Sequence, residues 1–320
     1  MAGVLAFTVR RLVQMVLSLW AAVTLVFIAV TQLPGDPVRA LFGFQPPPPE
    51  LYARIRSDYH LDEPLLVQYG LYLRDLVTGD WGRGLPINAW GNPVPGPAVA
   101  DVVAATAPVS AVLLVGALVV QLVVGVVAGA LAAGGRGTGV TVYVLAMLLV
   151  GTPVVVAAYL LRVVFVDGLG WAPFSGAAGG AEAYVLPVLA LAGLSTGYVA
   201  LITRAEVGDT LRAPFVQAAL GRGLRRRRIL GVHALRPALT PVVTFVAANL
   251  GQLFVGLVVV EGVFGMPGIG NAVLASIEGR DRALLIGLTT VVIAAVIVAN
   301  AVADVAAAAL DPRVRLQPAT

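Results

Sequence analysis

Six long apolar blocks without charged residues constrain the fold of this chain more than any other feature of its sequence. A helix of roughly 20 residues crosses the hydrocarbon core of a bilayer, which is about 30 Å thick. Each block is long enough to do so, whereas the core of a soluble domain would not need six such stretches. The sequence therefore predicts an all-α integral membrane protein with about six transmembrane helices. The expected spans are Leu12–Val30, Val102–Ala133, Gly139–Leu161, Ala183–Thr203, Pro237–Val260 and Ala283–Ala303.

The composition agrees with a membrane protein and excludes one class of enzyme. Hydrophobic residues make up 59% of the chain and charged residues 12%, against about 25% charged residues in soluble domains. The chain has no cysteine, which excludes disulfides and thiol chemistry. All 21 basic residues are arginine. Because a Walker A site needs a lysine at the nucleotide phosphates, the chain cannot itself be a conventional P-loop ATPase.

The N-terminal apolar run is interpreted as a retained first helix. Arg10 and Arg11 precede the run, as basic residues do in a secretory signal peptide. The run is too long for the apolar core of most signal peptides, and it ends in Leu33-Pro34-Gly35-Asp36-Pro37 instead of a small-residue cleavage site. We therefore expect this segment to stay in the membrane.

The distribution of arginines predicts that both termini are cytoplasmic, because short cytoplasmic loops are enriched in basic residues. Eight arginines lie between Arg204 and Arg236, whereas the segment between Asp167 and Glu182 has none. Five more lie in Pro34–Asp101, but long translocated segments are largely exempt from this rule. The expected protein is a multi-pass protein of the cytoplasmic membrane.

The segment from Pro34 to Pro97 is the most water-adapted part of the chain. It carries a run of four prolines and ends in a loop rich in glycine and proline, Asn88–Pro97. Glu50–His60 and Pro64–Leu76 favour amphipathic helices, and in the second of them leucines and a tyrosine recur at helical spacing. These features predict a small, partly helical cap on the outer face.

The loop Thr203–Leu235 is too polar to span the membrane and too long for a simple turn between helices. We expect a helix over about Val207–Leu220, a break at Gly221-Arg222-Gly223, and then the basic run Arg225–Arg228. Pro214 either kinks this helix or defines its N-terminal turn. Charge alone favours a basic loop that contacts anionic lipid head groups, whereas a helix that ends in a glycine turn suits contact with a partner.

Motifs in this loop and along the chain point to one family. Gln217-Ala218-Ala219 is followed, after three residues, by Gly223. This pattern resembles the Glu-Ala-Ala-x-x-x-Gly loop of bacterial ABC-importer permeases, with Gln217 in place of the glutamate. The segment His233–Thr244 is similar to the signature of the dipeptide/oligopeptide permease family. Further segments match the same family in the same order: Arg10-Arg11-Leu12, Leu33–Pro37, Leu61–Tyr69, Gly79–Gly82, Val260–Gly270 and Leu310–Arg315.

The resemblance implies the fold and partners of a type I ABC importer permease of the peptide-permease "B" kind, in the bacterial cytoplasmic membrane. In that family two different permease subunits pair, two cytoplasmic ABC ATPases bind the inner loops, and an extracytoplasmic protein delivers peptide. The ATPase subunits would bind ATP and Mg, so this chain is expected to hold no cofactor, metal or catalytic residue, and to bind no nucleic acid. The implied organisation is a first helix at 1–33, a cap at 34–97, a type-1 transmembrane domain at 98–309 with its coupling loop at about 204–236, and a cytoplasmic tail at 310–320.

The resemblance places coupling to ATP hydrolysis at five loop residues: Gln217, Ala218, Ala219, Gly223 and His233. The small side chains of Ala218 and Ala219 would let a helix sit deep in a cleft of a partner ATPase, and Gly223 would permit a sharp turn. The same small residues could instead allow ordinary close packing between helices. Their place in a charged loop favours docking.

Polar side chains within the expected spans are candidates for the translocation pathway. Thr240, Thr244, Asn249 and Gln252 are spaced so that they share roughly one face of the fifth helix. A polar face is costly toward lipid and is expected to meet a cavity or a partner helix. Hydrogen bonding between helices explains each of these residues equally well. The other candidates are Gln121, Asn300 and Asp304.

Other classes of function are less favoured. An ion-driven secondary carrier would need carboxylates in its core, but Glu261 and Asp304 are expected close to a membrane interface. A non-transporting scaffold for an ATPase is disfavoured by the polar residues within the spans. Among importers, nickel, glutathione or another small solute stays open as substrate, although two histidines, His60 and His233, and no cysteine do not favour a metal ligand set. Arg162 is expected to extend toward the outer surface.

Overall fold

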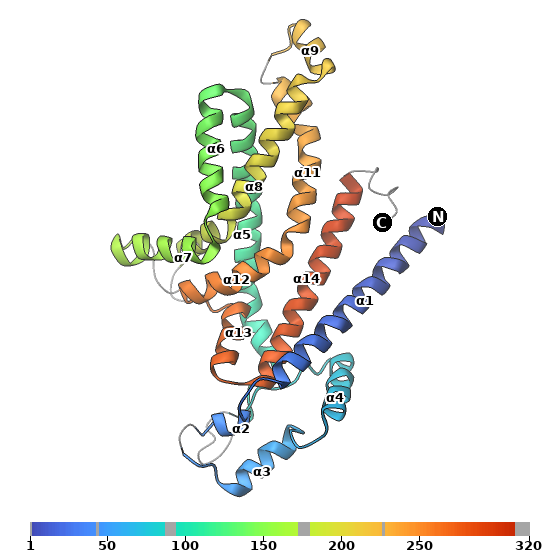
Figure 1. Cartoon of the computed structure of the whole chain (residues 1–320), viewed down its shortest axis with the longest axis vertical. Coiled ribbons are helices and arrows are strands. Elements are labelled where there is room, and N and C mark those ends of the chain that lie inside the picture. The colour runs from blue at the N-terminus through green and yellow to red at the C-terminus, as the bar shows by residue number, and fades with distance from the viewer. Residues whose placement is uncertain (1, 43–44, 87–93, 172–179, 226–227, 311–320) are drawn as a thin grey trace. The chain divides into compact units, whose positions relative to one another are not determined.

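The computed structural model of the chain describes residues 2–42, 45–86, 94–171, 180–225 and 228–310 (Figure 1). The described residues form helices and no multi-residue strand, and an isolated antiparallel bridge joins Arg83 and Ala98. The elements, in chain order, are α1 Ala2–Thr31, α2 Pro37–Ala40, α3 Pro49–Asp58, α4 Leu65–Thr78, α5 Val99–Gly134, α6 Arg136–Gly151, α7 Val154–Leu161, η1 Arg162–Gly168, η2 Ala181–Tyr184, α8 Val185–Arg212, α9 Pro214–Gly221, η3 Ile229–Ala234, α11 Leu235–Ala248, α12 Leu250–Phe264, α13 Ile269–Glu278 and α14 Arg282–Leu310.

The predicted membrane protein with about six spans is confirmed. Within the described residues, five straight helical segments are long and apolar enough to cross a bilayer, and two bent helix pairs bring the total to as many as seven. The straight segments are Leu12–Thr31, Val99–Gly134, Ala181–Arg212, Ile229–Ala248 and Arg282–Val302.

The third predicted span, Gly139–Leu161, is wrong as a single straight helix. The axes of the segments Gly137–Gly151 and Val154–Gly168 differ by 102°. Thr152 is extended, with φ −97° and ψ 113°, because the ring of the following Pro153 disfavours helical geometry at the residue before it. Pro153 also has no N–H to continue the helix. The chain therefore turns sharply between α6 and α7.

The fifth predicted span, Pro237–Val260, is divided in the structure. The helix α11 ends at Ala248, and α12 begins after Asn249, whose backbone angles are φ −93° and ψ 2°. The side-chain amide of Asn249 donates to the carbonyl of Phe245 at 3.4 Å. Side-chain bonds of this kind compete with the regular helical ladder. The four polar residues assigned to one face therefore lie on two helices and the kink between them.

The amphipathic helices predicted in the outer cap are present. The helix α3, Pro49–Asp58, corresponds to the expected helix at Glu50–His60. The helix α4, Leu65–Thr78, begins directly after Pro64 and extends two residues past the expected end. Val38, Phe42 and Ile55 form a buried cluster between α2 and α3, and burial of one such side chain contributes about 1.5–3 kcal/mol.

The chain divides into two compact units, each with its own apolar core. One unit comprises the chain up to Pro108 together with Gly268–Ile297, and the other comprises Val109–Pro267 and the chain from Val298 onward. The first unit buries Phe27 and Val30 of α1 with Leu285 and Ile286 of α14. The core of the second is built from α5, α7, α8 and α12 and includes Leu113, Ala158, Leu191, Leu257, Phe264 and Met266.

Glycines of α5 bring its backbone close to α8 in the second unit. A methyl group on Gly125 would lie 2.7 Å from Cγ1 of Val199, and one on Gly129 would lie 2.5 Å from the carbonyl oxygen of Ala200. Only residues without a side chain permit this approach, as in the small-xxx-small pairs of membrane helices. Residues further along α5 contact residues further along α8, so the two helices run parallel.

Candidate coupling turn and buried polar groups

The loop between α8 and α11 contains a separate short helix, α9, which we call the coupling turn together with residues 222–224. The predicted helix Val207–Leu220 is wrong as one helix, because α8 ends at Arg212 and α9 begins at Pro214. Ala213 between them is extended, with φ −64° and ψ 144°, as expected before a proline. Pro214 thus defines the first turn of α9 instead of kinking a longer helix.

One face of α9 is fixed to the protein, and the other is open. Val216 is fully buried, and the side-chain amide of Gln217 donates to the carbonyl of Leu211 at the end of α8, at 2.8 Å. Ala218 is exposed, and Phe215 exposes 55% of its surface. The helix therefore presents a small, largely apolar surface on a firm attachment.

Gly223 ends the coupling turn in a conformation that favours glycine. Its φ is +77°, and there is open space around the position where a side chain would be. The N–H of Arg222 donates to the carbonyl of Ala218 at 3.1 Å, and that of Leu224 donates to the carbonyl of Ala219 at 3.2 Å. This is the hydrogen-bonding pattern of a glycine-terminated helix. The predicted sharp turn at Gly223 is therefore present. Glycine is favoured there by the backbone conformation and not by crowding from neighbouring atoms.

The chain returns to the membrane through η3, a π-helix that contains His233. The side chain of His233 lies outside the described residues. Its role in the coupling loop stays a prediction.

Gln121, a predicted pathway residue, is enclosed within the second unit. Only 1% of its surface is exposed, and neither atom of its amide has a hydrogen-bond partner within the described part of the chain. It lies one turn before Gly125 on α5, and therefore on the face that approaches α8. An unbonded buried amide costs about 1–3 kcal/mol. Its place on a pathway stays a prediction.

The remaining pathway candidates are more open. Thr244 and Gln252 are exposed, whereas Thr240 and Asn249 are half-buried. The hydroxyl of Thr244 donates to the carbonyl of Thr240 at 3.0 Å, within α11. The side-chain oxygen of Asn300 is buried and has no hydrogen-bond partner among the described residues. None of these contacts distinguishes a pathway from packing between helices, so their assignment also stays a prediction.

A buried carboxyl that sequence reasoning did not place in the core joins two helices of the second unit. Glu261 of α12 has no exposed surface, and its Oε1 accepts a hydrogen bond from the hydroxyl of Ser110 on α5 at 2.6 Å. Two residues after Glu261, the carbonyl of Val263 accepts a hydrogen bond from the guanidinium of Arg162 at 2.7 Å. A cation suits the carbonyl-rich C-terminal end of a helix. Arg162, expected to extend toward the outer surface, is only 28% exposed and lies against α12.

Replacement of Glu261 with alanine is expected to destabilise the assembled transporter by about 1–3 kcal/mol, because it removes a buried hydrogen-bond acceptor and leaves a void. Thermal unfolding in detergent would measure the effect. Glu261→Gln keeps an acceptor for Ser110 and should cost less. In a double-mutant cycle, Ser110→Ala should add little once Glu261 is alanine. Fully additive effects would show that this hydrogen bond does not join the helices.

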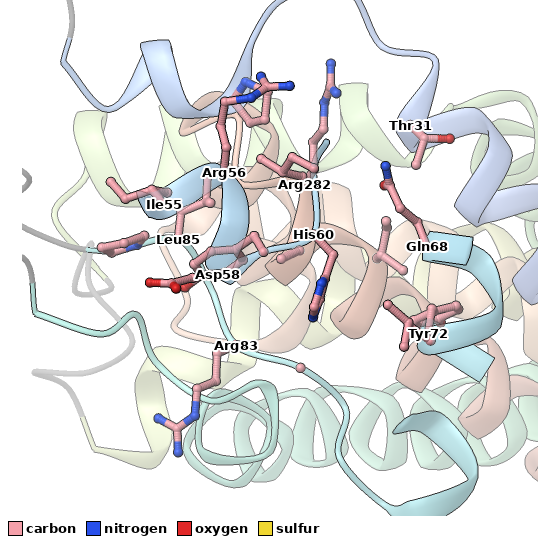
Figure 2. Close-up of a pocket in the computed structure, with 18 of the residues that line it drawn as sticks. Thr31, Ile55, Arg56, Asp58, His60, Gln68, Tyr72, Arg83, Leu85 and Arg282 are labelled. Carbon is pink, nitrogen blue, oxygen red and sulfur yellow. The ribbon is translucent and has the colours of Figure 1, made fainter. Parts of the chain in front are cut away.

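A pocket of about 860 Å³ lies in the first unit, between α3, α4, the segment 80–86 and the start of α14. Figure 2 shows Arg56, Asp58, His60, Tyr72 and Arg282 around it. Its lining contains four arginines and four aspartates, and Arg56 bonds to both Asp36 and Asp62. The balance of charge and the internal pairing indicate that these groups hold the cap together. They do not indicate a binding site for a ligand whose charges are all of one sign.

Two carboxyls at the base of the cap have shifted pKa values with opposite signs. Burial alone would raise the pKa of Asp36, but hydrogen bonds from the hydroxyl of Tyr52 and two backbone N–H groups, with the charge of Arg56, hold that pKa below its usual value. Burial raises the pKa of Asp281, and this rise is only partly offset by the N–H groups of Leu284 and Leu85. The carboxylate of Asp281 accepts a hydrogen bond of 2.8 Å from the N–H of Leu85, and this bond links the segment after α4 to the start of α14.

Comparison with known proteins identifies the class. Residues 121–316 match the family described as the binding-protein-dependent transport system inner membrane component, and residues 4–92 match the N-terminal part of such membrane components. The chain belongs to this family of transport-system membrane components. It is therefore a multi-pass membrane subunit of a transport system that has other subunits.

Named relatives are similar along almost the whole chain. The oligopeptide transport system permease protein OppB of Salmonella typhimurium is 36% identical over 97% of this chain and 99% of its own length. OppB of Haemophilus influenzae is 34% identical over the same shares. The glutathione transport system permease protein GsiC of Escherichia coli K12 is 31% identical, also over 97% and 99%. The resemblance to peptide ABC permeases seen in the motifs is confirmed.

Proposed function

We propose that this chain is the permease subunit of an ATP-driven importer that moves oligopeptides or dipeptides across the bacterial cytoplasmic membrane. The observation that carries the proposal is the 36% identity to an oligopeptide permease over 97% of the chain. In the working transporter it pairs with a second, different permease. Two cytoplasmic ATPases supply ATP and Mg binding, and an extracytoplasmic protein delivers the substrate. Both termini and the coupling turn lie on the cytoplasmic side.

The coupling turn suits transmission of force from the ATPases. Phe215 and Ala218 form an exposed apolar surface at the tip of the loop, which a cleft in an ATPase can cover. The buried Val216 and the bond from Gln217 to the end of α8 attach that tip to a long membrane helix. Movement of α9 by the closing ATPases therefore moves α8. Because α8 packs closely on α5 at Gly125 and Gly129, the two helices move together.

Glutathione is the second candidate substrate, since the glutathione permease GsiC is also similar over nearly the whole chain. Glutathione is itself a short peptide, so both candidates share amide groups and terminal carboxylates. The identity of 31%, against 36% for the oligopeptide permease, favours the first candidate.

Uptake by the assembled transporter in proteoliposomes tests the proposal. The complex would contain this chain, its paralogous permease, both ATPases and the binding protein. Labelled peptide should accumulate only when ATP and the binding protein are both present, and excess unlabelled oligopeptide or dipeptide should compete better than glutathione. Accumulation that needs an ion gradient and no ATP would make the protein a secondary carrier. Competition by glutathione alone would replace the substrate proposed here.

A further inference from the structure

The helix α4 has an apolar face that the rest of the described chain leaves uncovered. Leu66 is 84% exposed and Val77 is 87% exposed. Together with Gly70 and Leu73 they follow the spacing i, i+4, i+7, i+11, which places all four on one stripe of the helix. Arg74, at the edge of the stripe, is paired with Asp75 at 2.7 Å. The stripe itself carries no charge.

Contacts with α1 set the position of α4 along the membrane helices. The hydroxyl of Tyr69 lies 2.6 Å from that of Thr24, and the rings of Tyr69 and Tyr72 lie 5.3 and 5.6 Å from that of Phe27. Thr24 lies seven residues before the end of α1, which is about 10 Å along a helix that rises 1.5 Å per residue. The apolar span of α1 extends to Thr31. The face of α4 that carries Tyr69 and Tyr72 therefore lies beside the membrane span of α1, nearer to the middle of the membrane than the end of that span.

Contacts with α14 give the same position independently. The hydroxyl of Tyr72 lies 2.6 Å from that of Thr290, eight residues into a helix that begins at Arg282, or about 12 Å along its axis. The carbonyl of Trp81, just past the end of α4, lies 2.8 Å from where a Gly287 side chain would begin. Both ends of the segment from Tyr72 to Trp81 therefore meet α14 within its membrane-spanning part.

From these two depths we propose that α4 is an interfacial helix, immersed in the leaflet at which α1 ends, with Leu66, Leu73 and Val77 on the lipid acyl chains. Amphipathic helices of this kind lie with their apolar face about 5–10 Å into the boundary between head groups and acyl chains. Trp81 is partly exposed and lies where aromatic belts form at the membrane surface. For α4, this proposal differs from the water-adapted cap expected from the sequence.

Lipid fits this face better than water or a protein partner does. The neighbouring α1 also exposes large apolar side chains, Leu25 and Ile28, within its membrane span. The helix α3 provides the contrast, because its exposed side carries Arg54 and Asp58 as an ion pair of 3.8 Å. An aqueous cap would favour the surface of α3 on both helices.

Spin labels at single cysteines test the position of α4, and the absence of native cysteine makes this chain a clean background. Leu66→Cys and Val77→Cys would be labelled in the complete transporter in lipid nanodiscs, with cysteine-free partner subunits. Leu25→Cys provides the lipid reference and Ser57→Cys, exposed on α3, provides the water reference. Oxygen dissolves in the acyl chains, whereas a neutral nickel chelate stays in water. Each labelled complex must first retain ATP-dependent uptake.

Labels at Leu66 and Val77 should collide several-fold more often with oxygen than with the chelate, as the label at Leu25 should, and the label at Ser57 should show the reverse. Preference for the chelate at both α4 positions would place the helix in water and overturn the proposal. Low collision rates with both reagents would show that a protein subunit covers the stripe, and would overturn it as well. Neither outcome bears on the peptide substrate, which is tested separately.

Discussion

Replacement of Gly223 with valine is expected to abolish ATP-driven uptake while the protein stays inserted in the membrane. Gly223 has φ +77°, and a left-handed conformation costs a residue with a side chain roughly 1–2 kcal/mol, more for a β-branched one. The end of α9 should therefore unwind, and the exposed surface at Phe215 and Ala218 should lose its shape. Uptake assays and co-purification of the ATPases would measure the loss.

Two matched variants separate backbone conformation from added bulk. Gly223→Asn should keep most of the uptake, because asparagine tolerates the left-handed region better than other residues with side chains. Gly221→Ala lies within α9, in open space and without positive φ, so it should be neutral. If Gly223→Val transports normally with its ATPases bound, the turn is not the coupling element. If Gly223→Asn fails as completely as Gly223→Val, bulk and not conformation explains the effect.

The straight spans could be predicted from sequence because length without charge is a property of a single segment. The predicted span Val102–Ala133 differs from α5, Val99–Gly134, by only a few residues at its ends. The bends could not be predicted in this way. Pro153 was a visible signal for the first of them, but apolar residues continue on both sides of it. Asn249 gave a weaker signal, because its effect depends on a side-chain bond to Phe245.

The candidate site shows the same division. The sharp turn at Gly223 followed from its motif and from the chemistry of glycine, and the structure gives its φ and hydrogen bonds. The bond between Ser110 and Glu261 joins residues 151 positions apart, and nothing local indicates such a pair. An acid between apolar neighbours in α12 was a signal of burial, but it did not identify a partner. The depth of α4 could not be predicted from the sequence for a similar reason, since it is inferred from contacts with the distant residues Thr24 and Thr290.

Replacement of Gly129 with leucine is expected to prevent stable assembly of the permease. The first side-chain carbon at this position would lie 2.5 Å from the carbonyl oxygen of Ala200 and 2.6 Å from Cβ of Thr203. Two of the closest atoms, the Ala200 oxygen and the Arg204 nitrogen at 3.0 Å, belong to the backbone of α8. They cannot rotate away as a flexible side chain could, so α5 and α8 must separate.

Overpacking of a core costs about 1–3 kcal/mol and occasionally more, and we expect Gly129→Leu to reach or exceed the upper end of that range. Size-exclusion chromatography after graded heating would measure the loss of intact complex. Gly137→Leu on the exposed side of α6, where nothing lies within 4 Å, is the matched control and should leave stability nearly unchanged. Gly129→Ala should fall between the two, because one methyl group already meets the α8 backbone. Equal stability of Gly129→Leu and Gly137→Leu would mean that the two helices do not approach as closely as described, and α8 could then not carry α5 with it during transport.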